Sequence, residues 1–204
     1  MSLLLIRHGE TALNVARVLQ PATTKLSERG IAQAEALAAR LARMEVRAIL
    51  SSDLPRALRT AQAIAAATGA TVELTPLLRE RNFGDWRGLP YDDLALDPLT
   101  MAQAPPNGES AAAFAQRAAT AFALAVRRRA ALGGALAVVT HGLVLRALLS
   151  AHVRVADGMR APAHLGNTSL SIVGARAPHR VSLLNCTRHL DGSAADDAQA
   201  LSGG

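Results

Sequence analysis

Short apolar segments alternate along this chain with longer segments that have the periodicity of amphipathic helices. Four apolar segments have the length and composition of buried strands: residues 3–6, 46–50, 71–74 and 136–139. The helical patterns cover residues 28–44, 55–68, 110–132 and 142–151. Strands that alternate with helices favour a parallel sheet with helices on both faces. We therefore expect an α/β fold, a three-layer α/β/α sandwich with a mostly parallel central sheet and a late strand pair near residues 169–173 and 180–184.

The chain has 204 residues, half of them apolar, which is enough for one sizeable hydrophobic core. We expect a single domain over residues 1–190 and a disordered, polar tail over residues 191–204. The single cysteine, Cys186, excludes a disulfide within one chain and favours a reducing, cytoplasmic location. No apolar run reaches the length of a membrane span, so we expect no membrane partner.

The net charge of +6 comes almost entirely from arginine, since Lys25 is the only lysine. The densest basic run, residues 127–129, falls in the last turn of a predicted helix, where we expect solvated arginines that interact favourably with the helix dipole. Aromatic residues make up only 2% of the chain, which leaves little for stacking on single-stranded nucleic acid. The charge therefore favours a small anionic substrate and no nucleic-acid partner.

Polar side chains follow three of the predicted strands at the point where each strand ends. They are Arg7-His8, Ser51-Ser52 and Thr140-His141. Ligands of open α/β sheets bind beyond the carboxyl ends of the parallel strands, so we expect the two histidines and Arg7 to converge on one spot. Arg56 lies in the first turn of a helix that begins at the same edge, and helix N-termini attract phosphate. The sequence therefore predicts an anion pocket built from histidine and arginine.

Four sequence blocks include these residues and follow one another in order: LLLIRHGETALN, SSDLPRALRTA, LLRERNFGDWRG and VVTHG. Together they resemble the histidine phosphatase superfamily, also called the phosphoglycerate mutase-like family, over residues 3–173. The resemblance implies that His8 is the nucleophile, that it passes through a phosphohistidine, and that Glu80 donates a proton to the leaving oxygen. It places Arg7, Arg56 and His141 around the phosphoryl group, with Asn14 and the backbone N–H of Gly142 as further donors to its oxygens.

Gln20 is a further candidate for substrate binding, and here the chain departs from the family pattern. Many small phosphatases of this family have Gln-Gly followed by an aspartate, whereas this chain has Gln20-Pro21-Ala22. Proline stiffens a loop that commonly borders the substrate. The substrates of known family members therefore cannot be carried over to this chain.

The residue types suit phosphoryl transfer. A nucleophilic imidazole must be neutral, and in the family a backbone carbonyl holds its other N–H. Arginine is planar, permanently charged and bidentate, so two arginines and His141 can stabilise the phosphoryl oxygens without a metal ion or another cofactor. An acid near neutral pH needs a raised pKa, which burial beside Phe83 or Trp86 and a nearby phosphate dianion could give Glu80. Asp85 lies close in sequence and remains an alternative acid.

The superfamily contains phosphatases and mutases. A mutase needs additional basic residues for the second anionic end of its substrate, but residues 91–109 contain no lysine or arginine. The GDWRG segment also looks like the phosphatase branch of the family. We therefore expect a histidine acid-type phosphatase that hydrolyses a small phosphorylated metabolite, as a monomer or homodimer. The first alternative is a cofactor-dependent phosphoglycerate mutase. A phosphoprotein phosphatase and a non-catalytic phosphate-binding module rank after it.

Overall fold

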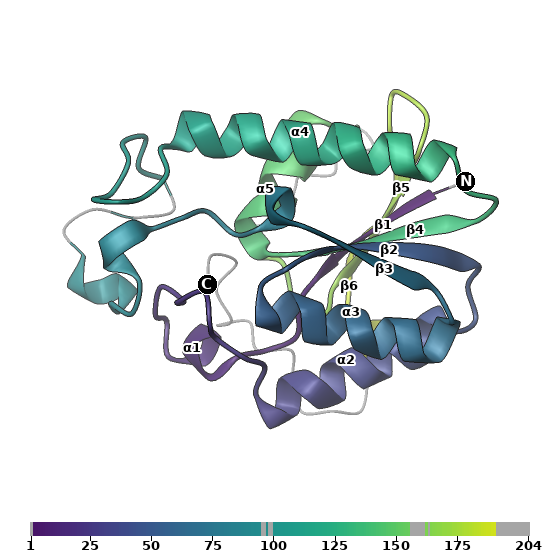
Figure 1. The fold of residues 1–204 in the computed structure, drawn as a ribbon, viewed down its shortest axis with the longest axis horizontal. Helices are drawn as coiled ribbons and strands as arrows, with labels where there is room; N and C mark the ends of the chain where they lie inside the picture. The colour runs from purple at the N-terminus through teal and green to yellow at the C-terminus, as the bar shows by residue number, and fades with distance from the viewer. Residues whose placement is uncertain (1, 95–96, 98–99, 156–161, 163, 191–204) are drawn as a thin grey trace.

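The computed structural model describes residues 2–94, 97, 100–155, 162 and 164–190. A central sheet in this part of the chain has the strand order β3-β2-β4-β1-β5-β6 (Figure 1). Its strands are β1 (Ser2–Arg7), β2 (Val46–Ser52), β3 (Thr71–Thr75), β4 (Ala135–Thr140), β5 (Leu170–Gly174) and β6 (Val181–Cys186). Strands β1 to β4 pair in parallel, whereas β5 runs antiparallel to both β1 and β6. The predicted strands and the late strand pair are confirmed, and the predicted tail of residues 191–204 lies outside the described residues.

Helices cover both faces of this sheet, which confirms the three-layer α/β/α sandwich (Figure 1). Helices α2 (Glu28–Leu41) and α3 (Pro55–Thr68) lie on one face, and α4 (Ala111–Ala130) and α5 (Gly142–Ala151) lie on the other. Shorter elements occupy the connections: α1 (Ala12–Val15) and the 3₁₀ turns η1 (Pro76–Leu78), η2 (Gly84–Trp86), η3 (Tyr91–Asp93) and η4 (Arg188–Leu190). No helix in the described ranges is long and apolar enough to cross a membrane.

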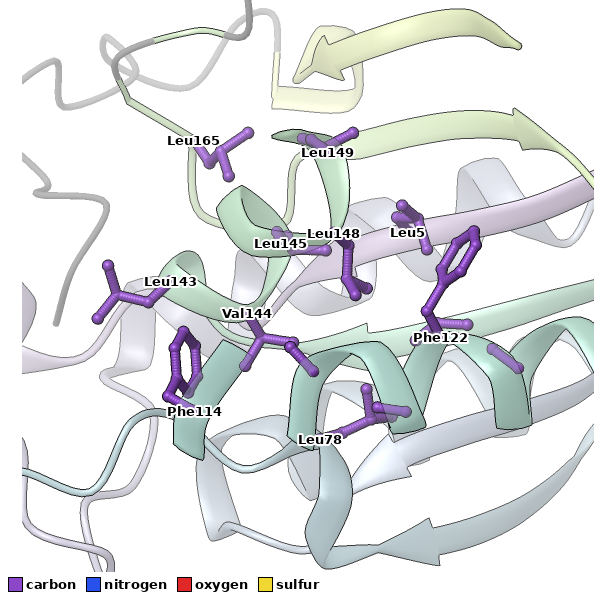
Figure 2. Close-up of a cluster of buried hydrophobic side chains, with 14 of the residues drawn as sticks. Leu5, Leu78, Phe114, Phe122, Leu143, Val144, Leu145, Leu148, Leu149 and Leu165 are labelled. Carbon is purple, nitrogen blue, oxygen red and sulfur yellow. The ribbon is translucent and has the colours of Figure 1, made fainter. Parts of the chain in front are cut away.

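The two buried faces of β1 explain why its sequence is a continuous apolar run. Leu3 and Leu5 belong to the core under α4 and α5, while Leu4 and Ile6 belong to the core under α2 and α3. Successive strand residues point to opposite faces, so a strand covered on both sides must be apolar throughout. Figure 2 shows the first of these cores, in which Leu5 faces Phe122 of α4. The strand is thereby fixed on both faces, and its polar C-terminal end is held in place.

The helix ends follow the sequence signals. The Ser27 hydroxyl accepts from the Gly30 N–H at 3.0 Å and caps the start of α2. The Ser110 hydroxyl accepts from the Ala113 N–H at 3.2 Å and caps the start of α4. Helix α3 begins with Pro55 and ends at Gly69, whose φ of 72° is the left-handed conformation that glycine adopts readily. These caps fix where α2 and α3 begin, next to the strand ends that they follow.

The prediction of a fully solvated arginine run at residues 127–129 is wrong for Arg129. Its side chain is buried and donates from Nη1 to the carbonyl oxygen of Leu132 at 2.7 Å. Ala118, Phe122 and Ala125 precede it at helical spacing on the buried face of α4. Position 129 therefore faces the sheet, while Arg128 lies outside and pairs with Glu73.

Candidate active site

The carboxyl ends of β1 and β4 bring two histidines together. Arg7 and Thr140 end these strands in register, and His8 donates from its backbone N–H to the Thr140 carbonyl oxygen at 2.9 Å. The His8 and His141 rings consequently lie with their centroids 5.1 Å apart. Parallel pairing thus produces the predicted convergence of strand ends.

His8 is held as a neutral imidazole. Its Nδ1 lies 2.6 Å from the carbonyl oxygen of Gly9, which can only accept, so Nδ1 carries the hydrogen. Burial, and then the charges of Arg56 and Arg7, lower the pKa of His8 well below its ordinary value of 6.5. Its Nε2 is buried and has no hydrogen-bond partner within the described residues. The lone pair on Nε2 is therefore available to a ligand.

Arg7 and Arg56 supply the positive charge of the site. Arg7 ends β1 and donates to the Leu165 carbonyl oxygen, and Arg56 follows Pro55 in the first turn of α3. Both guanidinium groups are almost fully buried, and burial lowers the pKa of each to about 10. Since these values remain far above neutral pH, both groups stay charged and can bind an anion.

Two buried amides present N–H groups to the same site. Asn14 accepts through Oδ1 from the Thr11 N–H at 3.1 Å and from Asn167 Nδ2 at 3.3 Å. Gln20 accepts through Oε1 from the Thr11 hydroxyl at 2.9 Å. In both residues the side-chain amide nitrogen therefore remains available to donate. It has no hydrogen-bond partner in the part of the chain that the structure describes.

Five predicted site residues each have a buried polar atom without a partner among the described residues: His8 Nε2, Asn14 Nδ2, Gln20 Nε2, Arg56 Nε and His141 Nδ1. Arg129 Nε on α4, which is not a predicted site residue, is also buried without a partner there. Leaving a buried donor or acceptor unpaired costs about 1–3 kcal/mol, so such groups are rare unless a ligand satisfies them. Asn14, Gln20, Arg56 and His141 can all donate hydrogen bonds, and His8 offers a lone pair in the same site. This combination suits an anion that has an electrophilic centre.

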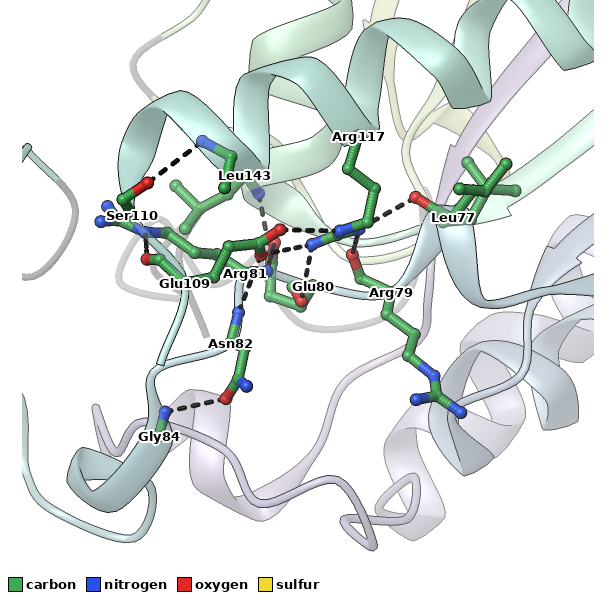
Figure 3. A network of polar contacts seen from close by, with 12 residues as sticks. Leu77, Arg79, Glu80, Arg81, Asn82, Gly84, Glu109, Ser110, Arg117 and Leu143 are labelled. Carbon is green, nitrogen blue, oxygen red and sulfur yellow. Dashed lines mark hydrogen bonds and ion pairs between the residues drawn. The ribbon is translucent and has the colours of Figure 1, made fainter. Parts of the chain in front are cut away.

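Glu80 is a buried carboxyl group beside this cluster. Its Oε1 accepts from the Arg81 N–H and its Oε2 from the Leu143 N–H of α5, both at 3.0 Å (Figure 3). Burial raises its pKa above the ordinary 4.5, against the lowering effects of these two hydrogen bonds and of Arg56 and Arg7. The alternative acid, Asp85, is exposed and binds the Asn107 amide at 2.9 Å. The geometry therefore brings Glu80, and not Asp85, into the cluster.

Gly142 is the first residue of α5, directly after His141, so its backbone lies at a helix N-terminus that points to the cluster. All eight predicted site residues therefore belong to the strand-end region or to the segments packed against it.

Sequence reasoning placed Ser52 at a strand end without giving it a role, and it missed Asn167 and Thr168; all three help to hold the cluster in place. Ser52 contacts His141, and Asn167 and Thr168 both donate to the carbonyl oxygen of His8, at 3.1 and 3.2 Å. The polar run 167–169 stands just before β5, and an antiparallel strand begins at the edge where parallel strands end. The position of this polar run before a strand was the sequence signal that could have identified Asn167 and Thr168.

The histidine phosphatase superfamily (branch 1) model matches residues 3–187. This chain belongs to that superfamily. It is 34% identical to the probable phosphoglycerate mutase GpmB of Yersinia pestis (strain Pestoides F), over 96% of this chain and 97% of the relative. The structure of a mycobacterial glucosyl-3-phosphoglycerate phosphatase in complex with VO3 is 31% identical, with a TM-score of 0.75 over 89% of this chain and 96% of that one. Bacillus stearothermophilus YhfR is also 31% identical, with a TM-score of 0.79 over 93% and 98%.

The superfamily membership is established by the sequence match, and its relatives carry phosphatase and phosphoglycerate mutase names. In this member of the superfamily, a cavity of about 680 Å³ opens beside Glu80. It shares Ala22, Leu54, Glu80 and Arg87 with a smaller hollow that Arg56 and Gln20 also line. His8 lines neither space. Gln20, Arg56 and Glu80 line the smaller hollow, and of these three residues Glu80 alone also lines the large cavity.

A network around Arg117 forms one wall of this cavity (Figure 3). Arg117 binds both carboxylate oxygens of Glu109, at 2.9 and 2.7 Å, and the carbonyl oxygens of residues 77, 79 and 80. Arg81 similarly binds the carbonyl oxygens of residues 101, 103 and 109. These bonds fix the backbone on both sides of Glu80, so its carboxyl group has a defined position.

Proposed function

We propose that this protein hydrolyses a small phosphomonoester through a phosphohistidine intermediate on His8. The observation that carries the proposal is the unpartnered Nε2 of the neutral His8 imidazole together with four unpartnered buried side-chain atoms of the same site. An anion that binds there satisfies the donors and meets the Nε2 lone pair at the same time. The proposal also agrees with the phosphatase names among the relatives.

In the first step, His8 Nε2 forms a bond to phosphorus while the bond from phosphorus to the ester oxygen breaks. Arg7, Arg56 and His141 stabilise the charge on the phosphoryl oxygens, which is the main contribution a protein makes to phosphoryl transfer. The protonated carboxyl group of Glu80 gives its proton to the departing oxygen, because an alkoxide is a poor leaving group. Positive charge from arginine takes the place of a metal ion in this scheme.

In the second step, a water molecule attacks the phosphohistidine. Its oxygen bonds to phosphorus, the bond from phosphorus to Nε2 breaks, and the Glu80 carboxylate accepts the proton that the water loses. Inorganic phosphate leaves, and His8 and Glu80 return to their starting protonation states. The raised pKa of Glu80 supports this double role, since the group must bind and release a proton at working pH.

The buried cluster and the adjoining cavity favour a metabolite over a phosphoprotein. His8 is 0% exposed and Arg56 is 1% exposed, so a phosphate must reach well below the surface. The cavity volume of about 680 Å³ lies within the usual range for small-molecule sites. A folded protein surface could not bring a short phosphorylated side chain to that depth as easily.

The mutase alternative remains because the relative GpmB carries a phosphoglycerate mutase name. The two activities are separated by a panel of phosphorylated metabolites scored for released phosphate, run beside an assay for conversion of 3-phosphoglycerate into 2-phosphoglycerate. We expect phosphate release with no isomerisation above background. Isomerisation that outpaces phosphate release would overturn the proposal in favour of a mutase.

A further inference from the structure

Three arginines line the cavity beside Glu80, and they differ in what neutralises them. Arg79 binds both oxygens of Asp53, at 2.7 and 2.5 Å, and its side chain points away from the Arg117 network in Figure 3. Arg117 binds both oxygens of Glu109. The guanidinium group of Arg87 has no hydrogen bond or ion pair to any residue in the described ranges. Its charge is therefore available to a ligand.

Arg87 also lies at the junction between the two spaces. It lines the large cavity together with Glu80, and it lines the smaller hollow together with Arg56 and Gln20. Its charge contributes to lowering the pKa of Arg56, so it is close enough to act on the phosphate site. Partial burial, and then the positive charge of Arg79, lower the pKa of Arg87 itself.

The backbone around Arg87 is held firmly. The Gly88 N–H donates to the Leu19 carbonyl oxygen at 2.6 Å, and the Asp85 N–H donates to the Pro106 carbonyl oxygen at 3.0 Å. Gly84 and Gly88 have φ values of 54° and 92°, a conformation that other residues seldom adopt. The loop therefore presents Arg87 from a fixed base, which a specific contact requires.

We propose that Arg87 binds a second anionic group, a carboxylate or a phosphate, on the leaving group of the substrate. The inference rests on the proposed function, since it takes Glu80 as the acid at the ester oxygen. A leaving group that begins at Glu80 enters the cavity that Arg87 lines. Guanidinium binds carboxylate and phosphate in a bidentate manner.

Three nearby carboxylates within the described residues have other partners. Glu109 is occupied by Arg117, and Asp53 by Arg79. Asp85, two residues away in sequence, binds the Asn107 amide. One available arginine on the leaving-group side is also consistent with hydrolysis, because a mutase must hold a second phosphate in a reacting position and needs more basic residues there.

The test compares kcat/KM within two matched pairs of substrates. 3-Phosphoglycerate has a carboxylate where glycerol 3-phosphate has a hydroxymethyl group, and fructose 1,6-bisphosphate has a second phosphate that fructose 6-phosphate lacks. We expect the wild-type protein to prefer the anionic member of at least one pair by about tenfold or more, the scale of a hydrogen bond to a charged group. The pair that shows the preference identifies the anion as carboxylate or phosphate.

Arg87→Gln should abolish that preference, and Arg87→Lys should keep part of it, since it retains the charge without the bidentate geometry. Arg127→Gln is the matched control, because it removes one positive charge from an exposed position of α4 outside the cavity. The preference should survive in the control variant. An electrostatic effect of net charge alone would instead lower it equally in Arg127→Gln and Arg87→Gln, and would overturn the inference.

The outcomes separate the inference from the function on which it rests. If the protein hydrolyses p-nitrophenyl phosphate but treats both members of each pair alike, the role of Arg87 is wrong and the phosphatase proposal stands. An equal loss on all substrates in Arg87→Gln would also overturn the inference, because Arg87 would then act on the transferred phosphoryl group. If no phosphomonoester is hydrolysed at all, the proposed function itself fails.

Discussion

The hydroxyl group of Ser52 lies 2.8 Å from Nε2 of His141, inside the buried cluster. Ser52 Oγ accepts from the Leu54 N–H at 3.3 Å, and the hydroxyl hydrogen can be donated to Nε2. Burial, followed by Arg56, His8 and Arg7, lowers the pKa of His141 well below 6.5, so the ring is neutral and carries one hydrogen. A donor at Nε2 places that hydrogen on Nδ1, the unpartnered atom, where it can bind a phosphoryl oxygen.

We therefore expect Ser52 to act as a positioning residue that selects the tautomer of His141. Ser52→Ala should lower kcat by about tenfold, the effect of one weakened hydrogen bond in the transition state, with a smaller change in KM. Ser52→Thr keeps the hydroxyl group and should recover activity. A purely structural role would lower the melting temperature without separating kcat from KM, and that result would contradict the expectation.

Glu80→Gln should slow hydrolysis in proportion to how poor the leaving group is. Alkyl phosphates need a proton on the departing oxygen, and loss of a general acid typically costs 10²–10⁴-fold. p-Nitrophenyl phosphate has a stable leaving group and should lose much less in this step. Asp85→Asn is the matched control in the same loop and should change neither rate. An equal loss for both ester types would move the acid role to another residue.

The pH dependence of kcat/KM should be a bell. On the acid side, activity falls as His8 is protonated, and since its pKa is lowered, that limb should lie below pH 6.5. On the alkaline side, activity falls as Glu80 loses its proton, and since its pKa is raised, that limb should lie above pH 4.5. Glu80→Gln should remove the alkaline limb and keep the acid one. An acid limb at or above pH 6.5 would show that His8 is not the neutral group described.

His8→Ala should abolish both turnover and the covalent phosphoenzyme, since Nε2 of His8 supplies the lone pair that attacks phosphorus. The adduct can be trapped by acid-free quenching after mixing with labelled substrate, because phosphohistidine is labile in acid. His164→Ala, at an exposed histidine, should retain both signals. Wild-type activity should also persist in excess chelator; loss of activity with EDTA would contradict charge stabilisation by arginine alone.

The alternation of strands and helices was sufficient to predict the layers and the polar strand ends, because parallel strands with buried faces have a continuous apolar pattern and a common carboxyl edge. The burial of Arg129 was missed because residues 127–129 were treated as one basic run. The helical spacing from Phe122 and Ala125 places position 129 on the buried face of α4. Contacts such as Ser52 to His141 and Arg117 to Glu80 join residues far apart in sequence. Many of them end on backbone carbonyls, which carry no residue-specific signal, so no local pattern predicts them.

Asn167 and Thr168 both donate hydrogen bonds to the backbone carbonyl oxygen of His8. They belong to a segment that follows all four sequence blocks that resemble the family. A shortened protein that ended after α5 would keep every residue assigned to chemistry, yet it would lose the support under the attacking ring. The presence of the RHGET and VVTHG blocks in a fragment therefore does not show that the fragment is catalytically active. Activity depends on the C-terminal part of the chain, where Asn167 and Thr168 pack beside the end of β1 and support His8.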